Sequence, residues 1–422
     1  MPLVRQMPNH LAWTMPFPLP AIQHQIRLAD LDGWLLADFR GTNPVALHLC
    51  DLHSSGTRRW FLYIPATGSP RLLVHAIEQG TFAELAASLD IPLDTYVGWQ
   101  ELHTRVGELL AEAKVVAMEF SANNDMPTLD LVGAGTIQLV REVGQVRVEG
   151  SQDLVQAFQA VLTPDQVASH RAAAAIVLET KDAAFEEAAR AIEDGRPLTE
   201  YELQQFIVQR LAGEGLDPDH APIVAVNAHA ADPHFEPVEQ ASSPIRRGDI
   251  LLIDLWGKQI DRPNSCFADV TWTAWCGAQV PSQVAAIFKT VGNARDTALE
   301  FMDRELSTGR PVQGAQVDDA CRQVIADAGY GNAFIHRTGH SLGTQVHFTG
   351  VNIDNLETRD SRTLVPGVMF TIEPGIYLPD LPFGEDGRVG VGIRSEVNCL
   401  AGERGVEVTT LPLQTCMTAL LA

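Results

Sequence analysis

The chain contains 422 residues, of which 45% are hydrophobic and 20% are charged, an ordinary balance for a folded protein. Because single hydrophobic cores stop growing at roughly 250–300 residues, this length predicts two domains. Lys and Arg number 30 against 53 Asp and Glu, which gives a formal net charge of −23. So acidic a chain repels nucleic acid and anionic membrane surfaces, and we expect neither as a partner, whereas divalent cations and small zwitterions remain compatible.

The first twenty residues are rich in proline and lack periodicity, which favours an extended arm. They are too polar and too broken by proline for a signal peptide, and no run approaches the roughly 18 apolar residues of a membrane helix. The six cysteines show no paired spacing, which favours free thiols in a reducing compartment. We therefore expect a cytoplasmic protein.

Short apolar runs bounded by glycine, proline and polar clusters predict strands in the first part of the chain. They cover residues 33–39, 59–64, 71–75 and 115–120, and a helical stretch over residues 76–89 falls among them. Strands mixed with helices predict an α/β domain over residues 1–158. Neither G-x-G-x-x-G nor G-x-x-x-x-G-K-[ST] occurs in it, so no phosphate-binding loop is expected there.

From residue 159 to residue 422 the pattern changes to helices interleaved with hairpins. Helices are predicted from near Gln166, after the capping-box pair Thr199 and Glu202, and near residues 282–306 and 317–328. Strands are predicted over residues 223–226, 250–255, 268–275, 368–376 and 391–397. This alternation predicts an α+β domain.

Two aspartates stand out in the second domain. Asp254 ends the apolar run ILLID, Asp269 begins the run ADVTWT, and a turn containing Pro263 and Asn264 joins the two. The two carboxylates are therefore predicted to approach each other across a hairpin. Buried carboxylates repel each other, and such a pair requires a shared proton or a cation. Taken alone, an aspartate at the end of a strand is more often an ordinary turn cap.

Three histidines lie within twelve residues in the segment HRTGHSLGTQVH, at positions 336, 340 and 347. Imidazole is the commonest transition-metal ligand, and the glycines between the histidines favour a loop. Glu373 in FTIEPGIY follows strand-like residues and precedes Pro-Gly, where burial demands a partner. Glu396 in IRSEV lies in an apolar strand with Arg394 two residues away, which by itself also fits a simple ion pair.

Together these segments supply four carboxylates and one imidazole: Asp254, Asp269, His340, Glu373 and Glu396. An oxygen-rich set of this charge suits two divalent ions such as Mn²⁺, Co²⁺, Fe²⁺ or Zn²⁺, rather than a cysteine-rich structural zinc. Two such ions can hold a bridging hydroxide as a nucleophile at neutral pH.

The order and wording of these motifs resemble the pita-bread metallopeptidase family (M24), which includes methionine aminopeptidase, aminopeptidase P and prolidase. The matching segments are LLIDLW, ADVTWT, HRTGHSLG, FTIEPGIY and GIRSEV. The resemblance covers about residues 160–422 strongly. The N-terminal domain is more loosely similar to the creatinase/prolidase N-domain, and LDGWLLADFRGTNP is most similar to bacterial Xaa-Pro dipeptidases. The implied fold is an α/β creatinase/prolidase-like domain followed by an α+β pita-bread catalytic domain.

The resemblance also implies roles for the matching residues. Asp269 and Glu396 would bridge the metals, Asp254 would bind one metal only, and His340 and Glu373 would complete the other site. Glu373 would also act as general base and acid. His234 and His347 match catalytic histidines that contact substrate. His336, Tyr377 and Arg394 match positions that bind substrate or orient the site.

Three departures from the family pattern occur in this chain. The interval of fifteen residues between Asp254 and Asp269 is longer than usual, Trp272 stands where Arg is common, and Arg-Ser-Glu-Val replaces Arg-Ile-Glu-Asp around Glu396. None of them removes a ligand residue.

The resemblance implies a prolidase, a metallopeptidase that hydrolyses Xaa-Pro dipeptides, with Mn²⁺ as the first candidate metal. The alternative is an aminopeptidase P, which releases the N-terminal residue before proline from longer peptides. A metal-free creatinase-like amidinohydrolase and a non-enzymatic binding protein are further alternatives, and the intact set of ligand residues argues against both.

Members of this family often form homodimers in which the partner's N-domain reaches the active site, and we expect a homodimer here. The charged pair Asp38 and Arg40, at the end of an apolar strand, would then suit the two termini of a dipeptide. A local ion pair at the strand end is the competing interpretation. The preferred residue before proline and the native metal remain open at this point.

Overall fold

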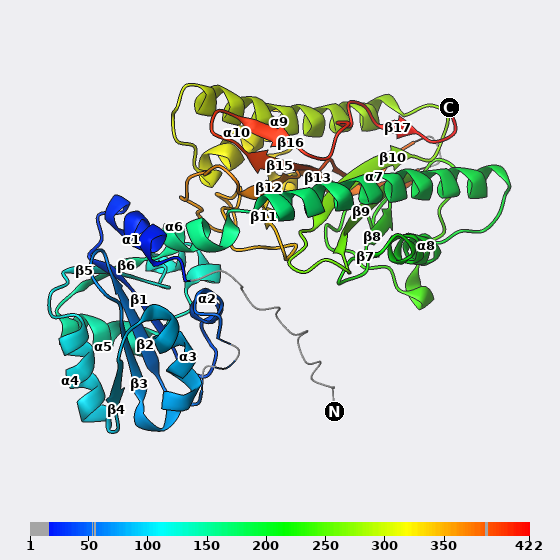
Figure 1. Ribbon diagram of the computed structural model, residues 1–422. Coiled ribbons are helices and arrows are strands. Elements are labelled where there is room, and N and C mark those ends of the chain that lie inside the picture. Colours follow the sequence, from blue (N-terminus) through cyan, green and yellow to red (C-terminus); the bar gives the residue numbers. More distant parts are fainter. Residues whose placement is uncertain (1–16, 53, 55, 385–386) are drawn as a thin grey trace. The chain divides into compact units, whose positions relative to one another are not determined.

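The computed structural model describes residues 17–52, 54, 56–384 and 387–422 (Figure 1). The chain divides into two compact units, Met1–Gln159 and Ala160–Ala422. Most of the expected N-terminal arm lies outside the described residues, and helix α1 (Leu19–Leu28) begins where that arm was expected to end. Among the described helices, none combines the length and the apolar composition that a bilayer crossing demands.

The first unit is built on a mixed sheet with the strand order β4-β3-β2-β1-β5-β6. Its strands are β1 (Gly33–Asp38), β2 (Trp60–Pro65), β3 (Arg71–His75), β4 (Leu93–Tyr96), β5 (Val115–Met118) and β6 (Arg147–Gly150). Strand β2 is antiparallel to both neighbours, whereas β3–β4, β1–β5 and β5–β6 are parallel pairs.

Helices cover both faces of this sheet because its strands are apolar on both sides (Figure 1). The helices are α2 (Pro44–Leu49), α3 (Gln79–Leu89), α4 (Trp99–Leu109), α5 (Ala134–Gly144) and α6 (Gln152–Val155). On β1, Trp34 and Leu36 face the core shared with α1, α2, α3 and α6, while Leu35 faces the core shared with α4 and α5. This is the expected α/β organisation.

The described residues of the second unit form four long helices and three sheets. The helices are α7 (Pro164–Glu193), α8 (Glu200–Gly213), α9 (Ser282–Ser307) and α10 (Gly314–Asp327). The capping box of Thr199 and Glu202 is present, and a second one, Thr163 with Gln166, begins α7.

The sheets of this unit have the orders β17-β10-β9-β7 with β8 beside β9, β11-β12-β15-β16, and β13-β14. Their strands are β7 (Leu216–Asp217), β8 (Ile223–Val226), β9 (Ile250–Gln259), β10 (Ala268–Trp275), β11 (Ser341–Leu342), β12 (Met369–Ile372), β13 (Gly375–Phe383), β14 (Arg388–Arg394), β15 (Val397–Ala401), β16 (Val406–Val408) and β17 (Thr418–Ala419). Helices α7 and α8 pack with β9 and β10 in one core, and α9 and α10 pack with β12 to β15 in another (Figure 1).

Two predicted strands are interrupted at the glutamates that the sequence singled out. The run over residues 368–376 splits into β12 and β13 at Glu373 and Pro374, and the run over residues 391–397 splits into β14 and β15 at Ser395 and Glu396. Pro374 has no N–H to donate to a ladder, which explains the first break. Strand β9 also continues past Asp254, which lies in its middle rather than at its end. Both glutamates therefore lie in links between strands.

His170 joins α7 to the strands from a fully buried position. Its Nδ1 lies 2.7 Å from the carbonyl oxygen of Phe267, and its Nε2 lies 2.6 Å from Oγ1 of Thr409. Burial lowers the pKa of this imidazole from 6.5 to about 4. As the pH falls from about 6.5 to about 4, His170 is protonated in the unfolded chain before it is protonated in the folded one. The free energy of unfolding therefore decreases over this pH range.

We expect His170→Gln to lower the Tm at pH 7.5 because it disturbs two buried hydrogen bonds. At pH 5 the wild type is also destabilised, because its unfolded chain binds a proton at His170 that the folded chain does not. The difference in Tm between wild type and variant should therefore be smaller at pH 5 by about 2 °C or more. Thermal unfolding of both proteins at the two pH values measures this gap. An equal gap at both pH values would contradict the assigned pKa.

Candidate metal centre

Alternation along β10 separates an apolar face from a polar one. Ala268, Val270 and Ala274 belong to the core shared with α7 and α8. Because side chains alternate along a strand, Asp269 and Thr271 point to the opposite face. Thr271 pairs directly with Asp254 of β9, so both aspartates lie on one face of this hairpin, as the sequence predicted.

The histidine loop is tied to the end of β12 by backbone contacts. The backbone N–H of His340 donates to Oγ1 of Thr371 at 3.0 Å, and that of Glu373 donates to the carbonyl oxygen of Thr338 at 2.7 Å. A Cβ on Gly339 would lie 1.9 Å from the carbonyl oxygen of Thr371, so only glycine allows this approach. These contacts bring His340 and Glu373 to the same place.

The side chains of Asp269, His340 and Glu396 each offer one ligand atom, and these atoms all lie within 4.8 Å of one another. Nε2 of His340 is 3.6 Å from Oδ2 of Asp269 and 3.5 Å from Oε1 of Glu373. Two ligand atoms that each lie about 2.1 Å from a shared ion are separated by roughly 3–3.5 Å. The distances from His340 to Asp269 and Glu373 are therefore close to those between ligand atoms of one cation.

Three carboxylate oxygens of this cluster are buried without a hydrogen-bond partner among the described residues. They are Oδ1 of Asp254, Oδ1 of Asp269 and Oε1 of Glu396. A buried carboxylate oxygen without a donor is costly unless a cation neutralises it. The donor set of carboxylates and one imidazole, with no thiol, suits a divalent transition metal. The residues present thus fit the metal that the motifs imply.

Without a cation, these carboxylates hinder each other's ionisation. Burial raises the pKa of Asp269 well above 3.8, and the charge of Asp254 raises it further. Burial also raises the pKa of Glu396 well above 4.5, with Asp269 and Glu373 adding to the effect. Burial is likewise the largest cause of the raised pKa of Glu373. A cation bound among these carboxylates would offset their mutual repulsion and stabilise their ionised forms.

The imidazole of His340 is oriented as a metal ligand would be. Its Nδ1–H donates to the carbonyl oxygen of Ser341 at 3.1 Å, which leaves the lone pair of Nε2 facing the carboxylates. Burial lowers the pKa of this imidazole, so it is neutral at physiological pH. A neutral imidazole is the form that coordinates metals.

Arg394 connects the carboxylates to an adjacent row of polar groups. Its Nη2 donates to Oδ2 of Asp254, its Nε donates to Oγ1 of Thr271 at 2.9 Å, and its Nη1 donates to the hydroxyl of Tyr377 at 3.2 Å. Thr271 in turn donates to Oε2 of Glu396 at 2.7 Å. Arg394 thereby fixes the orientation of two of the cluster's carboxylates.

Tyr377 extends this row to His336. The tyrosine hydroxyl lies 2.8 Å from Nε2 of His336, whose Nδ1 lies 2.7 Å from the carbonyl oxygen of Arg337. Burial lowers the pKa of His336 to about 3 and raises that of Tyr377 to about 12. With Nδ1–H donating to Arg337, Nε2 of the neutral imidazole accepts the hydroxyl proton. The tyrosine thus donates to His336 while accepting from Arg394.

His234 and His347 lie at the exposed border of the cluster. The ring of His347 packs edge-on against that of His340, with centroids 4.4 Å apart. Nη1 of Arg394 lies 3.4 Å from the carbonyl oxygen of Pro233, which places the segment bearing His234 beside Arg394. Both histidines are therefore accessible to a molecule that approaches the carboxylates.

Asp38 and Arg40 belong to the first unit. Asp38 is buried, and it accepts hydrogen bonds from the backbone N–H of Gly41 at 3.0 Å, from that of Asn43 at 2.8 Å and from Nε1 of Trp60 at 3.3 Å. Arg40 is exposed, and its guanidinium lies 5.3 Å from the ring centroid of Phe39. Asp38 therefore holds its own loop in place, whereas Arg40 remains accessible.

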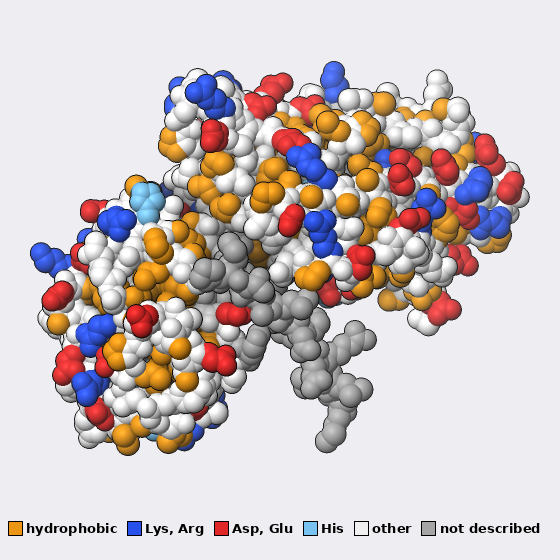
Figure 2. Space-filling model, viewed as in Figure 1, with side chains coloured by type: hydrophobic (Ala, Val, Ile, Leu, Met, Phe, Trp, Pro, Cys, Tyr) orange, Lys and Arg blue, Asp and Glu red, His pale blue; other side chains and the backbone are white. Residues whose placement is uncertain are grey.

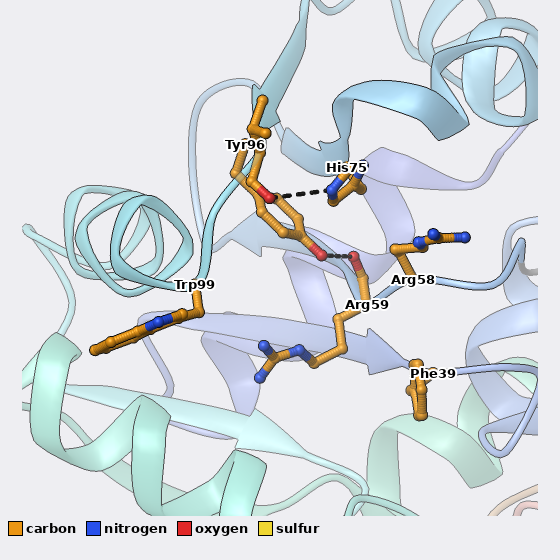
Figure 3. A pocket seen from close by; sticks show the side chains of 7 residues that line it. Phe39, Arg58, Arg59, His75, Tyr96 and Trp99 are labelled. Carbon is orange, nitrogen blue, oxygen red and sulfur yellow. Dashed lines mark hydrogen bonds between the residues drawn. The ribbon is translucent and has the colours of Figure 1, made fainter.

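A pocket of about 540 Å³ opens at this end of the first unit's sheet (Figure 3). The hydroxyl of Tyr96 donates to the carbonyl oxygen of Arg59 at 2.8 Å, and Nε2 of His75 lies 3.1 Å from the carbonyl oxygen of Val97. The lining consists of Phe39, Arg58, Arg59, His75, Tyr96, Val97 and Trp99. Elsewhere, acidic and basic side chains are interspersed over the face shown in Figure 2.

Several residues that hold the cluster in place were not apparent from the sequence. Asn398 clamps the backbone of Asp269: it accepts from the N–H at 2.9 Å and donates to the carbonyl oxygen at 2.5 Å. Thr271 and Thr371 each bind a carboxylate, that of Glu396 and that of Glu373. Thr271 could have been found, because it lies two residues after Asp269 on the same face of the strand.

Comparisons with known proteins find relatives and similar structures for most of this chain. Over 320 residues, 75% of this chain and 76% of the relative, the chain is 28% identical to the "Probable dipeptidase PepE" of Mycobacterium tuberculosis. The structure is similar to dipeptidase PepE from Mycobacterium ulcerans, with a TM-score of 0.65 and 24% identity over 95% of this chain and 96% of that one. It is also similar to an Xaa-Pro dipeptidase from Bacillus anthracis, with a TM-score of 0.56 and 20% identity over 95% and 98%.

These structural similarities confirm the expected fold, a two-domain pita-bread architecture. The model of metallopeptidase family M24 matches residues 169–403, more than half of the chain, and this range contains every residue of the carboxylate and imidazole cluster. The chain therefore belongs to metallopeptidase family M24 and is a metallopeptidase.

Proposed function

We propose that this metallopeptidase hydrolyses Xaa-Pro dipeptides, as a prolidase does. One observation carries the proposal: carboxylate oxygens of Asp254, Asp269 and Glu396 are buried without hydrogen-bond partners among the described residues, beside a neutral imidazole. The relatives named dipeptidase and Xaa-Pro dipeptidase support the choice of a dipeptide substrate.

The metal ligands in this proposal are Asp254, Asp269, His340, Glu373 and Glu396. Asp269 and Glu396, whose ligand atoms lie near each other and near His340, would be shared by two divalent ions, with Mn²⁺ as the first candidate and Co²⁺, Zn²⁺ and Fe²⁺ as alternatives. When bound, the two ions would supply an activated water as nucleophile and would polarise the peptide carbonyl. This suits an imide bond, which has no N–H and whose ring excludes ordinary proteases.

Protein side chains would carry out the proton transfers and hold the substrate. Glu373 would accept a proton from the nucleophilic water and return it to the leaving proline nitrogen, since its carboxylate lies beside the other ligand side chains, 3.5 Å from Nε2 of His340. His234 and His347, at the exposed border, would contact the substrate near the scissile bond. His336, Tyr377 and Arg394 would bind the substrate or fix its orientation through their shared row of hydrogen bonds.

Three further features belong to the same proposal. We propose a homodimer, a cytoplasmic location, and a contribution of Arg40 to dipeptide binding through its exposed guanidinium. Asp38 is bound to its own loop, so we assign it to positioning Arg40. If Arg40 grips a dipeptide terminus, Arg40→Ala lowers kcat/KM for a dipeptide at least about tenfold, because a charged hydrogen bond is worth about 1.5–3 kcal/mol. An unchanged kcat/KM would remove Arg40 from the site.

Substrate length distinguishes a prolidase from an aminopeptidase P. The Mn²⁺-loaded protein is given Leu-Pro and Leu-Pro-Ala together, and mass spectrometry follows both peptides, with a chelator-treated sample as control. We expect Leu-Pro to disappear and Leu-Pro-Ala to persist. Loss of the tripeptide would assign the protein to the aminopeptidase P activity instead. If neither peptide disappeared, Xaa-Pro hydrolysis would be excluded.

A further inference from the structure

Arg295 is an exception on the buried side of α9. All other buried residues of this helix are apolar or glycine, among them Val291, Ala294 and Ala298 on neighbouring turns. Arg295 itself is only 1% exposed. Burying a guanidinium costs several kcal/mol unless its donors are satisfied, and an apolar side chain of similar volume would often be no less stable. Its presence in this core therefore requires an explanation beyond packing.

The guanidinium of Arg295 donates hydrogen bonds both to the segment that carries Glu396 and to its own neighbour on α9. Nη1 donates to Oγ of Ser395 at 2.7 Å and to the carbonyl oxygen of Gln414 at 3.0 Å. Nε and Nη2 both donate to Oδ1 of Asp296, at 2.9 and 2.7 Å, which supplies the compensating charge. Ser395 is the residue between Arg394 and Glu396.

A second path from Arg295 reaches the same segment through Gln414. Nε2 of Gln414 donates to the carbonyl oxygen of Thr273 at 2.7 Å, and Oε1 accepts from the N–H of Thr273 at 3.4 Å. Oγ1 of Thr273 donates in turn to the carbonyl oxygen of Arg394 at 2.9 Å. Arg295 thus contacts Ser395 directly and reaches Arg394 through Gln414 and Thr273 of β10.

The segment at Ser395 and Glu396 is not part of a β-ladder. Ser395 and Glu396 lie in the link between β14 and β15. The N–H of Ser395 donates to the carbonyl oxygen of Pro374 at 3.3 Å, and the N–H of Glu396 donates to that of Thr271 at 3.0 Å. These two bonds hold the backbone, while the Ser395 side chain is held by Arg295 from α9. The orientation of the Glu396 carboxylate depends on this link.

We propose that Arg295 is a positioning residue for the candidate metal centre: through Ser395 and Gln414 it fixes the Arg394–Glu396 link and so aims the Glu396 carboxylate. The serine at position 395, where the related motif carries isoleucine, supplies the hydroxyl that this contact requires. The inference rests on the proposed metal ligands. Groups that orient metal ligands typically change metal affinity 10–100-fold when they are removed.

Calorimetric titration with Mn²⁺ tests this, on protein shown by circular dichroism to be folded at the titration temperature. Arg295→Met should weaken Mn²⁺ binding about 10–100-fold. Ser395→Ala should weaken Mn²⁺ binding about 3–10-fold. In the Arg295→Met background it should have little further effect, because both substitutions remove the same contact between Arg295 and Ser395. Arg304→Met, at an exposed arginine of the same helix, serves as the matched control and should bind Mn²⁺ as the wild type does.

The outcomes separate the inference from the function on which it rests. Wild-type affinity in folded Arg295→Met, or in Ser395→Ala if the first variant fails to fold, would overturn the positioning role alone. A fall in Tm without any change in affinity would show a purely structural role and would overturn it as well. No Mn²⁺ binding by the wild type would overturn the proposed metal centre, and this inference with it.

Discussion

Glu373→Gln is expected to lower kcat for Leu-Pro by about 10²–10⁴-fold, the usual contribution of a general acid–base residue. Oε1 of Glu373 lies 3.1 Å from Oγ1 of Thr371 and 3.5 Å from Nε2 of His340, so the carboxylate is fixed beside the cluster. Gln keeps the shape and the hydrogen bond to Thr371 but cannot take up and release the proton. The variant should therefore remain folded while it loses turnover.

Steady-state kinetics at saturating Mn²⁺ measure this effect, and the metal content of the same sample separates lost proton transfer from lost metal. Glu300→Gln, at an exposed glutamate of α9, is the matched control and should keep wild-type kcat. If Glu373→Gln retained kcat within about fivefold, far less than such a residue contributes, Glu373 would not be the acid–base group.

Glu396→Gln is expected to change stability in opposite directions with and without metal. The pKa of Glu396 is raised in the metal-free fold by burial and by neighbouring carboxylates. A raised carboxylate pKa means that the folded state holds its proton longer, so stability falls as the pH rises from about 4.5 through the raised pKa. The glutamine side chain of the variant has no ionisable proton, so its stability does not fall in this way as the pH rises.

At pH 7, the chelator-treated variant should therefore unfold at least about 2 °C above the chelator-treated wild type, and this advantage should vanish near pH 4. With Mn²⁺ the order should reverse, since a ligand that binds the folded state raises the Tm of the protein that binds it better. Scanning calorimetry of both proteins with and without Mn²⁺ gives the four values. A less stable metal-free variant at pH 7 would contradict the carboxylate repulsion.

The sequence predicted the groups of the candidate site better than the strands that carry them. Asp254, Asp269, His340 and Glu396 were recognisable because each lies in an apolar or glycine-rich context that leaves a polar group unexplained. That these side chains lie together was inferred from the order of the motifs along the chain. The breaks at Glu373 and Glu396 were not predictable from periodicity, because apolar residues continue on both sides of each break.

Helix ends were predicted where local chemistry determines them. The capping box at Thr199 depends only on residues three positions apart, so the sequence alone contains it. The contacts of Arg295 with Ser395 and Gln414 join residues about one hundred positions apart or more, and no local pattern reveals such pairs. For the same reason the clamp of Asn398 on Asp269 appears only in the folded chain.

The number of Mn²⁺ ions bound per chain shows whether the carboxylate cluster holds the metal on which hydrolysis depends. The wild type and Asp269→Asn are saturated with Mn²⁺, freed of excess by gel filtration, and measured for bound metal and for Leu-Pro hydrolysis on the same sample. We expect two Mn²⁺ per wild-type chain, less than one per variant chain, and a rate of hydrolysis that is proportional to the bound metal. Hydrolysis of Leu-Pro by metal-free protein, or full metal retention without Asp269, would contradict this expectation.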